Sequence, residues 1–279
     1  MSVKRSRIWL CADDYGISPS VNSAIRDLIS RGRINATSVM VAAPSFRQSE
    51  ASSLAALNAG ARRAAIGLHV TLTAPFRPLT AGFVPADGGT FLPLAATLKQ
   101  ASFHRFRRRQ LTAEITAQLE AFNAAFGRTP DFIDGHQHVQ LFPQVSEAFL
   151  DAAQAKAPHA WVRQCGRALP LHKRFSDLKG LLLDLLSLKF RARATALGVR
   201  TNAAFAGTYD FAAGADYAAL FPAFLESLPE NSVVMCHPGF VDDELKRLDP
   251  LTTLREREYA YFADERFPGV LDEHGVVLA

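Results

Sequence analysis

The chain has 279 residues, of which 48% are hydrophobic and 21% charged, and it contains 3 cysteines. These proportions are those of a globular protein and exclude a fibrous or disordered chain. A chain of this length buries enough surface to form a large core without disulfides or a structural metal. The odd number of cysteines and the lack of a CxxC pair favour a reducing compartment, so we expect a cytoplasmic protein.

No segment suits export or membrane insertion. The apolar run at residues 8–12 is shorter than the roughly 7–15 residues of a signal-peptide core. The richest apolar stretch, residues 178–190, is interrupted by charged side chains, whereas a membrane span needs about 20 apolar residues. We therefore expect neither an export signal nor a membrane span.

The net charge is +4, and the dense basic cluster lies at residues 104–109. Such a cluster is typical either of a nucleic-acid contact or of a solvated helix entrance. The other charges are mixed in sign along the chain. We therefore favour the second interpretation and expect no nucleic-acid partner.

Short apolar runs alternate with helical patterns from end to end, which is typical of βα units around a parallel sheet. Ser18 followed by Pro19 predicts the start of the first helix, and Gly127 predicts the end of another. Strands are expected at residues 8–12, 39–41, 66–72, 132–134, 161–163, 203–205 and 233–236. Helices are expected at residues 19–31, 45–59, 115–126, 178–190, 217–228 and 254–262.

About seven βα units without an intervening linker predict an α/β fold with one domain over residues 1–279. We expect an irregular, TIM-like (β/α) barrel, and a doubly wound open sheet is the alternative. Residues 73–94 are rich in proline and glycine, so they are expected to form a long loop insertion. That loop is either a wall of a binding site or an insertion without a role.

Side chains of the kinds that bind metals occur at or after the ends of several expected strands. They are Asp13 and Asp14, then His69, then His136 and His138, and finally His237. The carboxyl ends of barrel strands converge on one face, so these residues can share one site. Alternation along the strand places His69 and Gly67 on the face opposite the aliphatic residues, where an imidazole suits a divalent metal.

Asp13 and Asp14 are adjacent, so alternation predicts that their side chains face opposite ways. One carboxylate can then bind the ion while the other stands near its water. A helix-capping turn is the structural alternative, although Ser18 already supplies a cap. If the following motif stays extended, His136 and His138 project to the same side, and either Asp134 or Gln137 can orient an imidazole. His237 is either a general acid or a surface turn residue.

Four segments together resemble the YdjC/ChbG-type carbohydrate deacetylases, which include HpnK-like proteins. They are ADDYG at 12–16, GLHVTL at 67–72, DGHQHV at 134–139 and MCHPGF at 235–240. The resemblance covers nearly the whole chain and implies an irregular (β/α) barrel that removes acetyl from an N-acetylated amino sugar. By position, it implies one divalent metal held by Asp14, His69 and His136, with Asp13 as base and His237 as acid. Gln140 replaces a histidine common in this family, a difference that concerns substrate contacts more than the metal.

The sequence leaves several points open. Candidate substrate contacts are Arg163, Tyr15 and His138. Mixed histidine and aspartate ligands suit zinc and also magnesium. Another metal-dependent barrel hydrolase, either an amidohydrolase or a phosphoesterase, and a non-catalytic sugar-binding barrel are the alternative functions. The acetylated sugar is not identified, and a homo-oligomer is compatible with the sequence.

Overall fold

The computed structural model describes residues 5–61, 63–168, 178–212 and 214–279. The strands are β1 (Ser6–Tyr15), β2 (Ala36–Val39), β3 (Ala65–Val70), β4 (Phe132–Gly135), β5 (Trp161–Val162), β6 (Phe205–Ala206), β7 (Ser232–Cys236) and β8 (Val276–Leu278). The α-helices are α1 (Pro19–Ser30), α2 (Gln48–Ala56), α3 (Leu94–Ser102), α4 (Arg108–Phe126), α5 (Val145–Lys156), α7 (Leu178–Ala196), α8 (Tyr217–Leu225), α9 (Asp243–Leu248), α10 (Thr253–Ala263) and α11 (Phe267–Glu273). A 3₁₀ segment, η1 (His136–Leu141), follows β4.

Every expected strand overlaps one of β1 to β7, and every expected helix overlaps an observed one. Two of the predicted helix boundaries, one start and one end, are confirmed. The Ser18 side chain accepts a hydrogen bond from the backbone N–H of Val21 at 3.3 Å, with Pro19 in the first helical position. Gly127 ends α4 in the left-handed conformation, with φ of 66°.

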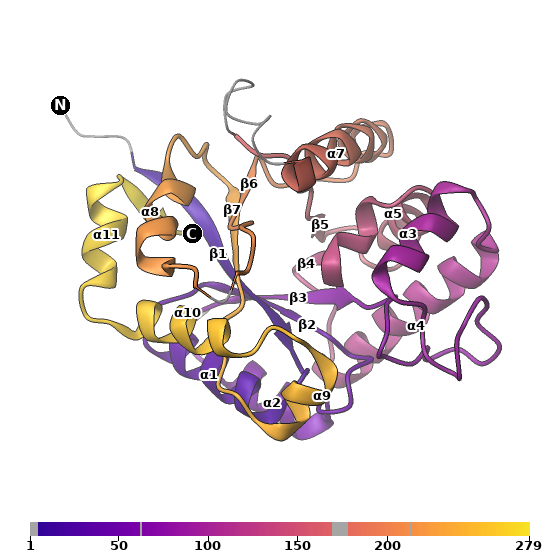
Figure 1. Ribbon diagram of the computed structural model, residues 1–279, viewed down its shortest axis with the longest axis horizontal. Coiled ribbons are helices and arrows are strands. Elements are labelled where there is room, and N and C mark those ends of the chain that lie inside the picture. Colours follow the sequence, from indigo (N-terminus) through magenta and orange to yellow (C-terminus); the bar gives the residue numbers. More distant parts are fainter. Residues whose placement is uncertain (1–4, 62, 169–177, 213) are drawn as a thin grey trace.

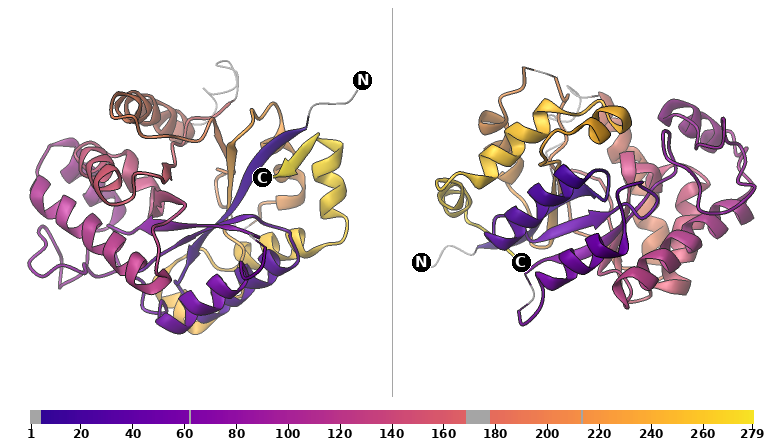
Figure 2. Two further views of the ribbon diagram at one scale, coloured as in Figure 1. Left: turned by 180° about the vertical axis from the view of Figure 1, so that it is seen from behind. Right: turned by 90° about the horizontal axis from the view of Figure 1, so that it is seen from below.

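All strand pairs are parallel, in the order β5-β4-β3-β2-β1-β7-β6, and β8 pairs with the start of β1. The helices form an outer layer, in which α4 contacts β3 and α5 while α1 contacts β1 and α10 (Figures 1 and 2). Within the described residues, isolated bridges join Val162 to Thr201 and Arg167 to Phe205 between the two edges of the sheet.

The α/β fold and its barrel-like curvature are therefore as expected, but the TIM-like barrel is not closed. The sheet is open between β5 and β6. These two strands have 2 residues each, too few to continue the hydrogen-bonded ladder around the barrel. The assignment of residues 1–279 to one domain stays a prediction.

Side chains on the concave face of the sheet form two layers. Paired residues of neighbouring parallel strands share a face, and the register pairs His69 with Asp134 and Phe132 with Trp161. In the layer toward the strand starts, the Trp161 ring stacks on Phe132 with centroids 4.6 Å apart and lies 6.2 Å from Trp9. Two residues further along the same strands, the charged layer begins. The aromatic residues thus form the floor of the site.

The loop at residues 73–94 is held against α4 and borders the charged layer. Glu114 of α4 accepts hydrogen bonds from the backbone N–H groups of Leu79 and Thr80, at 3.0 and 2.9 Å. Near the start of the loop, the buried Phe76 ring lies edge-on to His136 with centroids 5.6 Å apart. The loop therefore supplies one wall of the site, in line with the first of the two expected roles.

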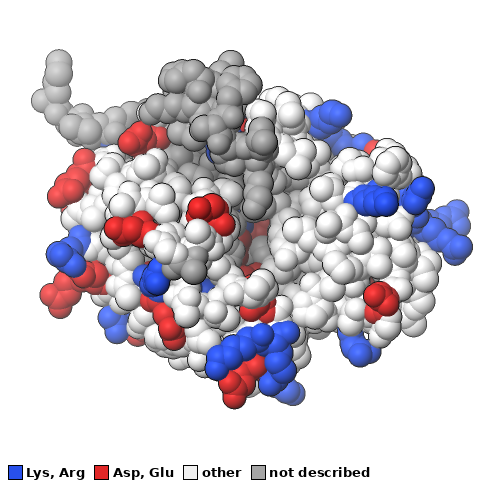
Figure 3. All heavy atoms as spheres, in the orientation of Figure 1, with Lys and Arg blue, Asp and Glu red and all other residues white. Residues whose placement is uncertain are grey.

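Charges of both signs are interspersed on the face drawn in Figure 3, which also shows a hollow near its centre with acidic atoms visible inside. In the basic cluster at 104–109, the Arg108 guanidinium pairs with Asp151 and lies 3.7 Å from Glu147. Among the residues that the structure describes, no helix combines the length and apolarity needed to cross a membrane.

Candidate metal and catalytic site

The end of β1 is distorted where the two adjacent aspartates lie. The register between β1 and β2 shifts between Ala12 and Tyr15, and Asp14 has a φ of 70°. A left-handed residue at such a bulge turns its side chain away from the regular alternation of a strand. The expectation that Asp13 and Asp14 face opposite ways is therefore wrong, and both carboxylates approach the neighbourhood of His69.

Asp14, His69 and His136 come together, each with one donor atom within 4.8 Å of the others. Asp14 Oδ1 lies 3.4 Å from His69 Nε2 and 2.9 Å from His136 Nδ1. All three side chains are buried. Ligands on a tetrahedral ion with bonds of about 2.0–2.1 Å are separated by roughly 3.3 Å. The spacing of these atoms therefore matches that of donors around one cation.

The remaining polar atoms of two of these residues are held by neighbours. His69 Nδ1 lies 2.6 Å from Asp134 Oδ1, and Arg255 Nη2 donates to Asp14 Oδ2 at 2.6 Å. An imidazole whose second nitrogen bonds a carboxylate is the usual arrangement of a metal-binding histidine. Because His69 Nδ1 and Asp14 Oδ2 already have partners, His69 Nε2 and Asp14 Oδ1 are the atoms left to bind an ion, and they lie next to each other. The donor set therefore fits a divalent cation. Of the two residues expected to orient an imidazole, Asp134 does so, and the imidazole is that of His69.

The surrounding charges shift the pKa values of these groups. Burial lowers the pKa of His69, but the carboxylates of Asp134 and Asp13 outweigh it and raise that pKa to about 10. Burial raises the pKa of the Asp14 carboxyl, yet His136 and Arg255 outweigh it and hold that pKa well below its usual range. Asp14 is therefore ionised at neutral pH, as a metal ligand must be, whereas His69 has to release a proton when it binds a cation.

The Asp13 carboxylate forms an ion pair with Arg163, which follows β5. Arg163 Nη1 donates to Asp13 Oδ2 at 2.6 Å, and Nη2 donates to Oδ1 at 2.7 Å. Burial raises the pKa of the Asp13 carboxyl, but Arg163 outweighs it and keeps that pKa well below its usual range. Asp13 is therefore an oriented, ionised carboxylate beside the cluster.

A second group of potential ligands contains Cys11, Asp13 and Asp134. The Arg163 guanidinium occupies the space between them, since its Nη2 lies 3.0 Å from Cys11 Sγ and 2.6 Å from Asp134 Oδ2. This group thus binds the guanidinium cation and leaves no room for a metal ion.

His237 follows β7 at the same edge of the sheet, and its ring is partly exposed. It lies edge-on to Phe211 with centroids 5.6 Å apart, and its buried Nδ1 has no hydrogen-bond partner among the described residues. Its backbone N–H donates to the buried Glu258 at 2.5 Å, and Tyr209 donates its hydroxyl to the same carboxyl at 2.7 Å. Its charge is among those that lower the pKa of Asp13. The ring therefore lies on the Asp13 side of this sheet edge and is partly open to solvent.

The DGHQHV segment does not stay extended. Gln137 and His138 have φ values of 55° and 60° inside η1, so the chain turns directly after His136. His138 Nδ1 lies 3.5 Å from Cys165 Sγ, and its ring meets Phe205 edge-on at 5.5 Å. The extended segment that would make both histidines project to one side is therefore not present. Burial and then Arg163 lower the pKa of His138 to about 3, so its ring is neutral.

Two of the three candidate substrate contacts are fully buried. The Tyr15 hydroxyl donates to the backbone carbonyl of Glu50 at 2.9 Å and receives a hydrogen bond from Arg26 at 2.8 Å. Arg163 has an exposed fraction of 0% and bonds Asp13. These contacts favour a positioning role for both residues. Gln140 is also buried and donates to the Arg163 carbonyl at 3.2 Å, while His138 is half-buried.

Sequence reasoning missed two residues that contact the cluster. Arg255 lies on α10, where no pattern distinguishes it from the other charged residues of that helix. Ser38 lies on β2, and its Oγ is 3.0 Å from His69 Nδ1 and 3.2 Å from Asp13 Oδ1. Ser38 pairs in register with Gly67, so a correct placement of β2 beside β3 would have predicted its direction.

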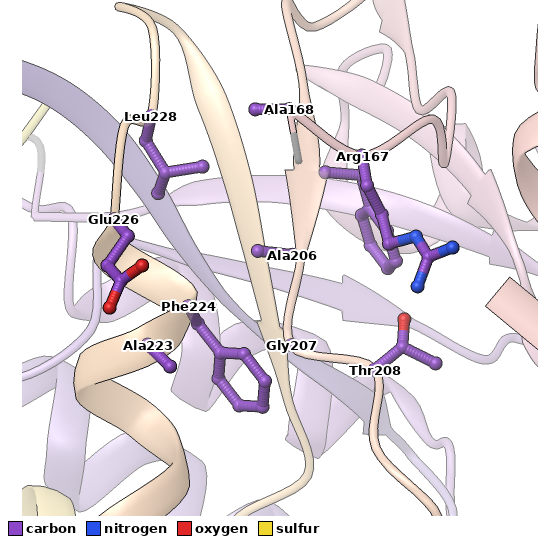
Figure 4. Close-up of a pocket in the computed structure, with 10 residues that line it drawn as sticks. Arg167, Ala168, Ala206, Gly207, Thr208, Ala223, Phe224, Glu226 and Leu228 are labelled. Atoms are coloured by element: carbon purple, nitrogen blue, oxygen red, sulfur yellow. The ribbon is translucent and has the colours of Figure 1, made fainter. Parts of the chain in front are cut away.

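A small pocket of ≈ 80 Å³ lies between β6 and α8 (Figure 4). Its lining is largely apolar and consists of Arg167, Ala168, Phe205, Ala206, Gly207, Thr208, Ala223, Phe224, Glu226 and Leu228. None of the candidate ligands lines it. One of its lining residues, Phe205, contacts His138.

Comparisons with known proteins identify relatives of this chain. The chain is 28% identical to a chitooligosaccharide deacetylase of Yersinia pestis over 246 residues, which cover 84% of this chain and 82% of that protein. It is 32% identical to a carbohydrate deacetylase of Mus musculus over 161 residues, 56% of this chain and 49% of that one. A crystal structure of a putative cellobiose-phosphate cleavage protein from Enterococcus faecalis superposes with a TM-score of 0.75 and 22% identity, and covers 99% of this chain and 97% of that one. A profile of YdjC-like proteins matches residues 7–273, so this chain belongs to the YdjC-like family.

Proposed function

We propose that this protein is a metal-dependent hydrolase that removes the N-acetyl group from an N-acetylated amino sugar. The observation that carries the proposal is the buried cluster of Asp14, His69 and His136 beside the oriented carboxylate of Asp13. The names of the bacterial and mouse relatives, both deacetylases of carbohydrates, support the substrate class.

Asp14, His69 and His136 would hold the divalent cation, which is zinc or magnesium. When bound, such a cation lowers the pKa of a coordinated water, to about 7 for zinc, and polarises the carbonyl of the acetyl group. Asp134 fixes the His69 ring, and Arg255 fixes the Asp14 carboxylate.

Asp13 acts as the general base. Arg163 keeps its carboxylate ionised and points it in one direction, so it can accept a proton from the attacking water. His237 acts as the general acid, because its partly exposed ring lies at the edge of the sheet that holds Asp13 and can give a proton to the departing amine. Each such proton transfer typically contributes about 10²- to 10⁴-fold to the rate.

The sugar lies against the open side of this cluster. The half-buried His138 and the loop wall near Phe76 are its proposed contacts, while Tyr15 and Arg163 act indirectly. The particular acetylated sugar, a cytoplasmic location and self-association stay predictions.

Acetate release tests the proposal. The purified protein is stripped with a chelator, reloaded with zinc or magnesium, and incubated with a panel of N-acetylated sugars that includes chitooligosaccharides. We expect acetate from the metal-loaded protein, none after chelation, and a large loss in Asp13→Asn. Phosphate release from sugar phosphates instead of acetate would favour the phosphoesterase alternative. Chelator-insensitive sugar binding without any product would favour a binding protein.

A further inference from the structure

A second pocket lies at the opposite end of the sheet from the proposed catalytic site. Trp9 is near the start of β1, Asp131 directly precedes β4, and Trp161 begins β5. Parallel strands start at the same edge, so this pocket is below the aromatic floor. It is lined by Trp9, Arg128, Thr129, Pro130, Asp131, His159, Trp161 and Arg200, with a volume of ≈ 380 Å³. This volume is within the roughly 300–1,000 Å³ of small-molecule sites.

Hydrogen-bond donors with positive charge dominate the polar lining. Asp131 is the acidic residue of the lining, and its Oδ2 already accepts from the Ile66 backbone at 2.8 Å and from Arg128 at 3.1 Å. Arg200 donates to the backbone carbonyl of His159, and no ion pair of Arg200 occurs in the described part of the chain. The pocket therefore presents an exposed guanidinium that has no carboxylate partner among the described residues, and such a group can pair with an anionic ligand.

The two tryptophans give the pocket a rigid aromatic side. The Trp9 and Trp161 rings are half-buried and inclined by 29° to each other. Trp161 is also stacked on the buried Phe132 with an interplanar angle of 14°, which fixes its ring. A fixed, partly exposed indole offers a flat apolar surface and an N–H donor to a ring-shaped ligand.

We propose that this pocket binds a sugar that carries an anionic group, either a phosphate or a carboxylate. The sugar ring lies against the tryptophans, and Arg200 binds the anion. The proposal is independent of the deacetylase activity, because the pocket shares none of the candidate ligands or catalytic residues.

Intrinsic fluorescence provides a direct measurement, because the chain contains 2 tryptophans and both line this pocket. The metal-loaded protein is titrated with glucose 6-phosphate, glucuronate, inorganic phosphate and glucose at constant ionic strength. We expect a saturable fluorescence change with at least one of the two anionic sugars, a weaker response to inorganic phosphate, and little response to glucose. Calorimetry with the same sugars measures the affinity without relying on the probe. The two anionic sugars separate phosphate from carboxylate recognition.

Arg200→Gln should weaken that affinity at least roughly tenfold, the effect expected when a charge-assisted hydrogen bond is removed. Arg63→Gln is a matched control. Arg63 also donates to a backbone carbonyl, that of Ser30 at 3.0 Å, but it lies outside the pocket. Circular dichroism checks that both variants fold, and Arg128→Gln replaces Arg200→Gln if the latter does not.

The proposal is overturned if no probe gives a saturable signal up to about 10 mM. Equal responses to glucose and the anionic sugars, or equal affinity in the folded arginine variant, would also overturn it.

Discussion

Asp13 and Arg163 form a two-point ion pair inside the curved sheet, with N–O distances of 2.6 and 2.7 Å. Their exposed fractions are 2% and 0%, so neither charged group is hydrated by bulk water. Two parallel charge-assisted hydrogen bonds fix the plane of a carboxylate as well as its charge. The proposed base is therefore oriented before any substrate arrives.

Asp13→Asn should bind metal normally and lose about 10²- to 10⁴-fold in turnover, because an amide cannot accept the proton of the attacking water. Elemental analysis measures the bound metal, and acetate release measures turnover. His237→Ala should also keep the metal and lose turnover, because no imidazole is left to protonate the departing amine. Near-normal turnover in Asp13→Asn would show that another group is the base.

Arg163→Met should destabilise the fold by about 3–5 kcal/mol, since it leaves the buried carboxylates of Asp13 and Asp134 without their cation. Combining it with Asp13→Asn should cost less than the sum of the two single changes, because the double variant has one unpaired charge fewer. Urea unfolding of the four proteins measures this difference. Strictly additive effects would contradict a direct coupling between the two residues.

His69→Ala should abolish metal binding, and Asp134→Asn should weaken it by about 10- to 100-fold, because Asp134 orients the His69 ring. Asp131→Asn is the matched control, since its carboxylate lies on the same segment but at the other end of β4. Calorimetric titration with zinc gives the three affinities. A wild-type affinity in Asp134→Asn would remove Asp134 from the site.

The low pKa values of Asp13 and Asp14 predict a loss of stability in acid. Both folded-state pKa values lie below the unfolded value of about 3.9, so the contribution of these groups is complete above about pH 5. It is lost as the pH falls through the unfolded value toward the folded ones. Asp13→Asn has one such group fewer, so its free energy of unfolding should decline less steeply than that of the wild type. Urea unfolding at pH 5, 4 and 3, which lie on either side of the unfolded-state pKa, tests this. Parallel declines in the free energy of unfolding of the two proteins would contradict it.

Much of the site follows from the periodicity of the strands. Alternation along β3 places His69 inward with Gly67, as predicted, and the convergence of strand ends brings His69 to Asp14 and His136. The turns were not predictable in the same way. Asp14, Gln137 and His138 all have positive φ, which non-glycine residues rarely adopt and which no local sequence signal marked.

Long-range contacts account for the other differences. Arg255 reaches Asp14 from 241 positions away, and its role depends on how α10 is placed against the sheet. The number of βα units predicts a TIM-like barrel, but whether that barrel closes depends on the length of β5 and β6. The helix α9 and the strand β8 have 6 and 3 residues, so their apolar periodicity is too brief to stand out. The helix α5, with 12 residues, was also not predicted.

Gly67→Ala should destabilise the protein by about 1–3 kcal/mol, the usual cost of overpacking a core. A Cβ at this position would lie 2.4 Å from the Phe132 ring, and that ring cannot move freely because it is stacked on Trp161. Gly269→Ala in α11 is the matched control, since a Cβ there meets no atom within 4 Å and alanine favours a helix. Phe132→Leu in the Gly67→Ala background should recover part of the loss by making room for the methyl group. Thermal and urea unfolding measure all three variants, and an undiminished stability of Gly67→Ala would mean that the aromatic floor is looser than the structure indicates.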